Sequence, residues 1–314
     1  AKILFDVLFE QKKDVRLIGN IGNPVLSEKK ITKKTVFVIE ASSYQLDYSK
    51  IFSSKYAIIL NISADHIERH GSLKNYINAK FKLLDSQTKN CIAYVKKDDK
   101  FINQKLKLKK YNSKIIKVNT KKNYNIFRRI NNNYFFSDTN KENLSFIIEI
   151  SKRLKLKNNL FLKTLQKFKG LKYRQQIIFR DNSLTIINDS KSTSFSSSMS
   201  LLKTNNNIYW LLGGINKKGD KFSLSKKYFK NIKAFIFGKN KFFFNQKLKG
   251  KIEYKNFNNL KEALKKIFSI VNKKKFTDKI ILFSPCAASF DNFKNFEERG
   301  LYFNKLVKKY LNGI

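Results

Sequence analysis

Short apolar runs recur along the chain and are separated by stretches long enough for a helix. Buried strands are expected at residues 36–39, 57–60, 92–95, 115–118, 184–187, 208–212, 234–237 and 280–283. Near-continuous apolar runs are typical of parallel strands covered on both faces. Helices are expected at residues 1–9, 73–85, 143–156, 260–271 and 294–310. This alternation predicts an α/β fold with parallel sheets.

The 314 residues suffice for two domains, each with its own core. Residues 137–171 have a mainly helical pattern, which Gly170 interrupts. We therefore expect one domain at residues 1–171 and a second at residues 172–314. Three consecutive asparagines at residues 131–133 indicate a turn between two short strands.

The chain is strongly basic, with 66 Lys and Arg against 23 Asp and Glu, a formal charge of +43. Such a charge would suit a protein that binds nucleic acid. The lysines, however, are spread along the whole chain, and aromatic residues lie inside apolar runs such as residues 209–212. This distribution favours a solvated lysine coat over a specific nucleic-acid surface, which stays an alternative.

The two cysteines, Cys91 and Cys286, each lie in an apolar stretch and are expected to be buried free thiols. Their number and spacing predict neither a disulfide framework nor a zinc site. The sequence shows no signal peptide and no apolar run of about 18 residues. We expect a cytoplasmic monomer that does not insert into a membrane.

In the first half of the chain, polar residues follow two expected strands. Residues 19–24 read Gly-Asn-Ile-Gly-Asn-Pro, which suits a tight turn beside a ligand or a simple strand-to-helix connection. Glu40 ends an apolar run. A carboxylate at the carboxyl end of a parallel strand faces the crevice where such sheets bind ligands, and it is a natural ligand for Mg²⁺. A helix cap or an ion pair is the alternative.

Both histidines of the chain, His66 and His70, lie just after the next expected strand, in the sequence Asp-His-Ile-Glu-Arg-His. A cluster of this kind at a strand end favours a functional site. Imidazole is a poor match for Mg²⁺, so composition alone does not assign His66 to that metal. Lys80 is one of 66 basic residues and is not distinguished by composition.

In the second half, three strand ends carry polar or small residues. Residues 188–193 read Asn-Asp-Ser-Lys-Ser-Thr, residues 211–217 contain Gly-Gly and Lys217, and residues 284–291 read Ser-Pro-Cys-Ala-Ala-Ser-Phe-Asp. Backbone N–H groups and a lysine at strand ends bind anions well. We expect these three segments to converge on one cleft.

Taken in order, these motifs resemble those of the Mur ligases over nearly the whole chain. Residues 19–82 resemble the central domain of that family, and residues 188–300 resemble its carboxy-terminal domain. The segment at residues 284–300 most resembles the member that adds D-glutamate to UDP-N-acetylmuramoyl-L-alanine. The resemblance implies an incomplete P-loop-type central ATPase domain followed by a Rossmann-like domain.

The resemblance also implies roles for individual residues. Glu40 would bind the Mg²⁺ that bridges the ATP phosphates, and His66 would bind a second Mg²⁺ together with Lys80 as its carbamate. The ATP contacts would be Asn140, Arg174, Asp189 and Lys191. The contacts with the nucleotide substrate and with D-glutamate would be Asn20, Ser42, Thr193, Lys217, Ser289, Phe290 and Phe296.

The implied reaction serves peptidoglycan synthesis, and thereby cell shape and division. The substrate carboxylate would attack the γ-phosphate of ATP, and the amine of D-glutamate would then displace phosphate from the acyl phosphate. A sibling Mur ligase, a folylpolyglutamate synthetase or a decayed, inactive copy are the alternatives.

Two departures from the family pattern matter. Thr139 stands where the family usually has a histidine, which weakens the assignment of Asn140. No G-x-x-x-x-G-K-[ST] phosphate loop occurs, and residues 1–9 resemble the helix that would follow one. We therefore expect that this chain does not turn over ATP by itself.

Overall fold

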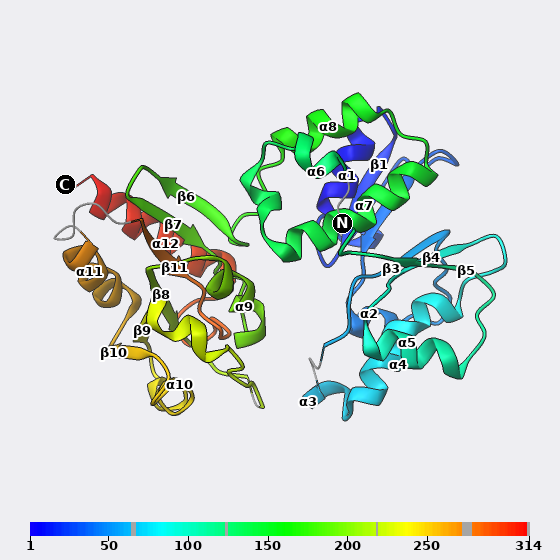
Figure 1. The fold of residues 1–314 in the computed structure, drawn as a ribbon. Coiled ribbons are helices and arrows are strands. Elements are labelled where there is room, and N and C mark those ends of the chain that lie inside the picture. The colour runs from blue at the N-terminus through cyan, green and yellow to red at the C-terminus, as the bar shows by residue number, and fades with distance from the viewer. Residues whose placement is uncertain (64–66, 123–124, 218, 272–277, 313–314) are drawn as a thin grey trace. The chain divides into compact units, whose positions relative to one another are not determined.

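The computed structural model describes residues 1–63, 67–122, 125–217, 219–271 and 278–312 (Figure 1). The chain forms two compact units, residues 1–169 and residues 170–314. The division falls before Gly170, whereas the sequence pattern places the domain boundary after Leu171.

The amino-terminal unit contains two parallel sheets. In the first, β1 (Val15–Gly19) pairs with β2 (Val36–Glu40), so that Gly19 lies opposite Glu40. The second has the order β3-β4-β5, formed by Tyr56–Ile59, Ile92–Lys96 and Lys114–Val118. The first four residues of the central strand β4 are all buried, as its continuous apolar run predicts.

Helices cover both faces of the β3-β4-β5 sheet. One core contains buried residues of α1 (Lys2–Glu10), α7 (Asp138–Arg153) and α8 (Asn158–Lys167), together with strand residues such as Tyr94. A second core joins β3 and β4 to α4 (Leu73–Asp85) and α5 (Lys100–Leu108). The remaining short helices are α2 (Ser43–Tyr48), α3 (Ile67–His70), α6 (Asn125–Arg129) and the 3-10 helices Val25–Ser27 and Asn133–Phe136.

The carboxy-terminal unit is built on one six-stranded sheet of order β10-β9-β8-β11-β7-β6 (Figure 1). Its strands, from β6 to β11, are Gln176–Arg180, Leu184–Asn188, Ile208–Gly213, Ile232–Phe237, Glu253–Phe257 and Lys279–Phe283. All neighbours pair in parallel except the edge strand β6, which runs antiparallel to β7.

Two separate cores cover the two faces of this sheet. One contains α9 (Phe195–Thr204) and α10 (Lys241–Leu248). The other contains α11 (Leu260–Val271) and α12 (Phe296–Leu311). The 3-10 helix Lys226–Asn231 connects β8 to β9.

The α/β architecture with parallel sheets is confirmed. Helices α4 and α11 have the bounds predicted from the sequence, and all eight expected strands are present. The pattern missed β1, β6 and β10. Polar residues interrupt β1 and β10 and leave β6 only three consecutive apolar residues. Strand β10, for example, reads Glu-Tyr-Lys-Asn-Phe at the sheet edge.

The prediction of a turn between two strands at residues 131–133 is wrong. These residues connect α6 to the 3-10 helix Asn133–Phe136. The side chain of Asn132 caps this 3-10 helix, and its amide donates hydrogen bonds to the carbonyl oxygens of Leu165 and Phe168. An asparagine that caps a helix and one that forms a turn look alike in sequence.

Two further expectations concern the thiols and the membrane. Cys91 and Cys286 are both buried and free, as predicted. None of the helices in the described ranges is both long and apolar enough to span a bilayer.

Candidate functional site

In the carboxy-terminal unit, the chain leaves the neighbouring strands β7 and β11 toward opposite faces of the sheet. After β7 the chain continues into α9, and after β11 it continues into α12; these two helices belong to cores on opposite faces of the sheet. In sheets of this kind, ligands bind at the carboxyl ends of adjacent parallel strands whose connections leave toward opposite faces. We call this position, with residues 188–193 and 284–291, the crevice. The segments with Asp189 and Ser284 lie together at this point. That all three segments form one ligand cleft stays a prediction.

Asp189 joins the ends of β7 and β11. Its carboxylate accepts hydrogen bonds from the hydroxyl of Ser284 at 2.8 Å and from the backbone N–H of Gln175 at 3.0 Å. Only 5% of the residue is exposed. Burial raises its pKa from 3.8 to about 7, although Ser284, Gln175 and the nearby Arg174 act in the opposite direction. Asp189 is therefore a buried polar residue at the strand ends, and we call the layer of such residues the floor of the crevice.

Short polar side chains extend this floor toward α9. The hydroxyl of Ser284 lies 2.5 Å from that of Ser198, which lies 2.7 Å from the hydroxyl of Ser192. The thiol of Cys286 lies 2.9 Å from Ser198, and burial raises the pKa of this thiol. All four side chains are buried, so their mutual hydrogen bonds replace those with water.

Lys191, a predicted ATP contact, lies beside Phe296, a predicted D-glutamate contact. Its ammonium nitrogen lies 3.9 Å from the ring centroid of Phe296, the first residue of α12. A cation over an aromatic face is attracted by the ring and is thereby held in place. Its backbone N–H donates to the carbonyl oxygen of Tyr173 at 3.0 Å, which fixes the loop after β7.

The remaining predicted residues of this unit have different environments. Thr193 and Lys217 are half-buried, on the loops after β7 and β8. Ser289 is buried, on the loop after β11, and Phe290 beside it is 71% exposed. Their contacts with a substrate stay predictions.

Arg299 is a central residue of the crevice that the sequence analysis did not assign. It is 1% exposed. Its guanidinium donates to the hydroxyl of Ser190 at 3.1 Å, to the carbonyl oxygen of Ser190 at 2.7 Å and to that of Ala287 at 3.0 Å. Burial lowers its pKa to about 10. The arginine therefore ties the loop after β7 to the loop after β11.

A signal for Arg299 was present in the sequence. It follows Phe296 by three positions and precedes Phe303 by four, so it lies on the same side of α12 as these two rings. A charged residue on an apolar helix face is expected to have buried partners.

In the amino-terminal unit, a tight turn brings Asn20 beside Glu40. The backbone N–H of Asn20 donates to the carbonyl oxygen of Glu40 at 2.8 Å, and its side-chain amide lies 3.4 Å from the Glu40 carboxylate. The turn closes through a hydrogen bond from the N–H of Asn23 to the carbonyl oxygen of Leu17 at 3.0 Å. Two residues predicted to bind ligands thus lie together at the ends of β1 and β2.

The turn depends on Gly22, whose φ is +84° and whose added Cβ would lie 2.1 Å from the carbonyl oxygen of Leu17. Gly22→Ala is expected to lower the free energy of unfolding by about 2–4 kcal/mol, from backbone strain and overpacking together. Gly71→Ala is the matched control, because φ is +72° but the nearest atom is 4.0 Å away. Urea unfolding followed by circular dichroism measures both; equal losses would show that the close contact is unimportant.

Ser42 and Asn140 have structural partners. The hydroxyl of Ser42 accepts from the backbone N–H of Gln45, whose side chain accepts in return from the N–H of Ser42, which forms a capping box for α2. The side-chain amide of Asn140 donates to the carbonyl oxygen of Tyr134 at 2.7 Å, and the residue is 6% exposed. All of these hydrogen bonds are within the protein. The predicted contacts of Ser42 with substrate and of Asn140 with ATP therefore stay predictions.

Lys80 lies on α4, with its ammonium nitrogen 5.1 Å from the ring centroid of Tyr76. His66, its predicted partner at a metal ion, lies outside the described residues. Within the described ranges, no three His, Cys, Asp or Glu side chains group as a metal site would require.

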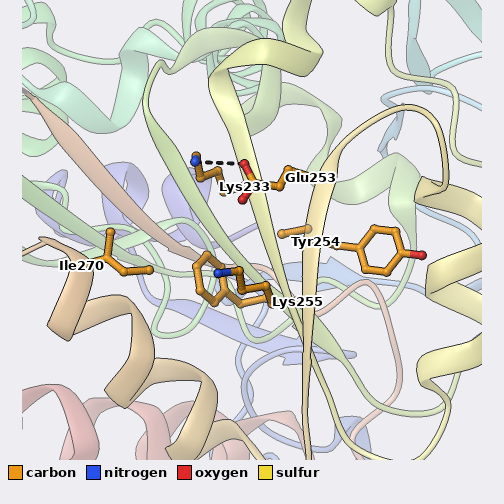
Figure 2. Close-up of a pocket in the computed structure, with 7 residues that line it drawn as sticks. Lys233, Glu253, Tyr254, Lys255 and Ile270 are labelled. Carbon is orange, nitrogen blue, oxygen red and sulfur yellow. Dashed lines mark ion pairs between the residues drawn. The ribbon is translucent and has the colours of Figure 1, made fainter.

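A small hollow lies elsewhere, between β9 and β10 (Figure 2). Its volume is about 70 Å³, and an ion pair of 2.9 Å between Lys233 and Glu253 borders it. These two residues are near the amino-terminal ends of their strands, opposite to the crevice. A space of this size holds about two water molecules, so it is too small for a nucleotide or an amino acid.

Comparison with known proteins identifies the family. The model named Mur ligase middle domain matches residues 7–161. The UDP-N-acetylmuramoylalanine--D-glutamate ligase of Rickettsia felis is 34% identical over 334 aligned positions, which cover 99% of this chain and 73% of the relative. The chain belongs to the Mur ligase family.

Other Mur ligases give a consistent result. The ligases of the same name from Rickettsia bellii and Francisella tularensis are 31% and 32% identical, and the matches cover 97% and 93% of this chain and 72% and 68% of the relatives. The fold is shared with a MurF ligase from Thermotoga maritima, solved in complex with ADP (13% identity, TM-score 0.68, 98% of this chain and 77% of that chain). A MurF from Acinetobacter baumannii has a TM-score of 0.70 at 14% identity, over 98% of this chain and 73% of that chain.

Proposed function

We propose that this Mur ligase takes part in peptidoglycan synthesis by joining D-glutamate to UDP-N-acetylmuramoyl-L-alanine at the expense of ATP. The observation that carries the proposal is the match to ligases of that name at 31–34% identity, over 97–99% of this chain and 72–73% of the relatives. The crevice of the carboxy-terminal unit supports it, because that crevice holds the motif segments at residues 188–193 and 284–300. We propose a cytoplasmic monomer with no specific nucleic-acid partner.

Each unit has a separate task in this proposal. In the amino-terminal unit, Glu40 presents a carboxylate at a strand end beside the amide of Asn20, and such hard oxygen donors fit Mg²⁺. His66 and the carbamate of Lys80 would complete a second site. Bound Mg²⁺ would offset the negative charge of the ATP phosphates.

ATP would contact Asn140, Arg174, Asp189 and Lys191 in this proposal. Lys191 has the most suitable environment, since its charge is oriented by the ring of Phe296. Asp189 would act from the floor of the crevice, where its carboxylate is already held by Ser284 and Gln175. The ADP bound by the Thermotoga maritima relative supports a nucleotide as ligand.

D-Glutamate carries two carboxylates and one amine. In our proposal the cation of Lys217 and the hydroxyls of Thr193 and Ser289 hold its carboxylates, while Phe290 and Phe296 border the pocket. The amine then attacks the acyl phosphate formed from the substrate carboxylate and the γ-phosphate; the new amide bond forms as the bond to phosphate breaks. Cationic side chains stabilise the negative charge that develops on the transferring group.

Saturation-transfer NMR of the chain with D-glutamate tests the amino-acid assignment, since it detects weak binding. We expect D-glutamate to bind at least about 10-fold more tightly than L-glutamate, since a site that pairs both carboxylates loses charge-assisted hydrogen bonds to the wrong enantiomer. Lys217→Ala should weaken binding by a similar factor, and Lys233→Ala, whose side chain pairs with Glu253, should not. Preference for a different amino acid would instead indicate a sibling ligase.

A further inference from the structure

His70, the second histidine of the chain, connects the two segments that carry the proposed metal-site residues. It is the last residue of α3 and is 9% exposed. Its Nε2 lies 3.0 Å from the hydroxyl of Ser43, the first residue of α2. Ser43 follows Glu40 by only three positions, and Glu40 ends β2. The imidazole is therefore bonded to the segment that leaves the Glu40 strand end.

The ring of His70 lies next to two tyrosine rings. Tyr44 of α2 stacks on it, with ring centroids 5.5 Å apart and an interplanar angle of 7°. Tyr76 of α4 lies at the same centroid distance with an angle of 59°. The carbonyl oxygen of His70 also accepts a hydrogen bond from the side-chain amide of Asn75 at 2.9 Å. These contacts hold the imidazole and attach it to the first turn of α4.

Tyr76 continues this connection to Lys80. The two residues are four positions apart on α4, so they lie on the same side of the helix. The Lys80 ammonium lies 5.1 Å from the Tyr76 ring centroid, and Tyr76 itself is 6% exposed. A continuous series of contacts thus runs from the Glu40 segment through Ser43, His70 and Tyr76 to Lys80.

We propose that His70 is a positioning residue that sets the location of Lys80 relative to Glu40. The inference rests on the proposed function, in which these two side chains serve one pair of metal ions. Their elements, β2 and α4, are separated in sequence by α2, β3 and α3, so local chain geometry does not fix their distance. Partners that orient metal ligands in this way typically change metal affinity by 10–100-fold when they are removed.

Two substitutions separate the contributions of the ring and of its nitrogen. His70→Phe retains an aromatic ring between Tyr44 and Tyr76 but leaves the Ser43 hydroxyl without its partner. His70→Gln removes the ring but retains a side-chain amide able to bond with Ser43. Gln87→Leu is the control for stability. Gln87 is buried, and the substitution removes its hydrogen bond of 2.8 Å to the Ser54 carbonyl oxygen in the same unit, outside this series of contacts.

Two measurements are made on the 314-residue chain. The first is Mn²⁺ affinity, measured by electron paramagnetic resonance. The second is the rate at which acetic anhydride labels Lys80, measured by peptide mass spectrometry relative to the exposed Lys74 of the same helix. We expect His70→Phe to weaken Mn²⁺ binding about 10-fold and to change the relative labelling of Lys80 at least about 2-fold. His70→Gln should restore most of both, and Gln87→Leu should alter neither.

The outcomes separate this inference from the proposed function. Unchanged Mn²⁺ affinity and unchanged Lys80 labelling in His70→Phe would overturn the positioning role. Equal effects of His70→Phe and Gln87→Leu would do the same, because they would indicate a general loss of stability. If the unsubstituted chain binds no Mn²⁺, the proposed metal site fails, and the labelling of Lys80 alone then decides the role of His70.

Discussion

Replacing Arg299 with methionine is expected to lower the free energy of unfolding of the carboxy-terminal unit by about 3 kcal/mol. The substitution leaves three buried acceptors without their donor: the hydroxyl and carbonyl oxygens of Ser190 and the carbonyl oxygen of Ala287. Each such group costs about 1–3 kcal/mol when unpaired. Part of this lost stability is regained, because methionine carries no charge that has to be desolvated when the unit folds.

Trp210 makes this prediction measurable in one unit alone. It is the only tryptophan of the chain, it is fully buried, and its Nε1 donates to the carbonyl oxygen of Ser284 at 2.8 Å. Its fluorescence during urea unfolding reports on residues 170–314. Arg180→Met is the matched control, because the Arg180 side chain is exposed and makes one hydrogen bond, to Thr185, so its loss should cost less than about 0.5 kcal/mol. Equal effects of the two substitutions would contradict a structural role for Arg299.

Replacing Asp189 with asparagine is expected to stabilise the carboxy-terminal unit at pH 8 relative to the unsubstituted chain. Burial raises the pKa of this carboxyl from 3.8 to about 7, so the folded state binds the proton more tightly than the unfolded state does. The stability that this group contributes is complete below pH 3.8 and is lost as the pH rises through about 7. The loss is on the order of 4 kcal/mol, since each pKa unit corresponds to about 1.4 kcal/mol, and an asparagine does not incur it.

The measurement is the difference in unfolding free energy between Asp189→Asn and the unsubstituted chain, taken from pH 4 to pH 8 by Trp210 fluorescence. We expect the difference to increase steadily up to about pH 7 and to level off above that value. Asp181→Asn is the control with the opposite sign: hydrogen bonds from the backbone N–H groups of Ser183 and Leu184 lower the pKa of Asp181, so its contribution is lost only in acid. A difference for Asp189→Asn that stays constant with pH would show that the carboxyl is charged throughout.

The sequence predicted what depends on local pattern. Helix α4 was found because its apolar residues follow the helical period, and the buried strand β8 was found because its residues form a continuous apolar run. The order of the motifs indicated the family. Strand β10 was missed because its sequence is mostly polar. Its strand conformation depends on pairing with β9, its one neighbour in the sheet, and this pairing is not visible in the local pattern. The turn at residues 131–133 was mistaken because the partners of Asn132 lie more than 30 positions away.

The candidate site was predictable to a similar extent. Strand ends showed where Glu40, Asp189 and Lys191 would lie, since parallel strands deliver their carboxyl ends to one edge. Sequence could not show that Asp189 is bonded to Ser284, 95 positions away, or that Arg299 joins two loops. Such contacts depend on how distant elements pack. His66 lies outside the described residues, so its assignment remains a prediction.

The hydrogen bonds that join Ser284, Ser198 and Ser192 at the floor of the crevice also run in one direction. A charged Asp189 can only accept, so the Ser284 hydroxyl donates to it and then accepts from Ser198, which in turn can accept from Ser192. Once Asp189 is protonated it gains a donor, and each hydroxyl is able to rotate and reverse its role. Hydrogen bonds in such a series polarise one another. The charge on one buried carboxyl thereby sets which way the hydroxyl protons point as far as the loop that leads into α9.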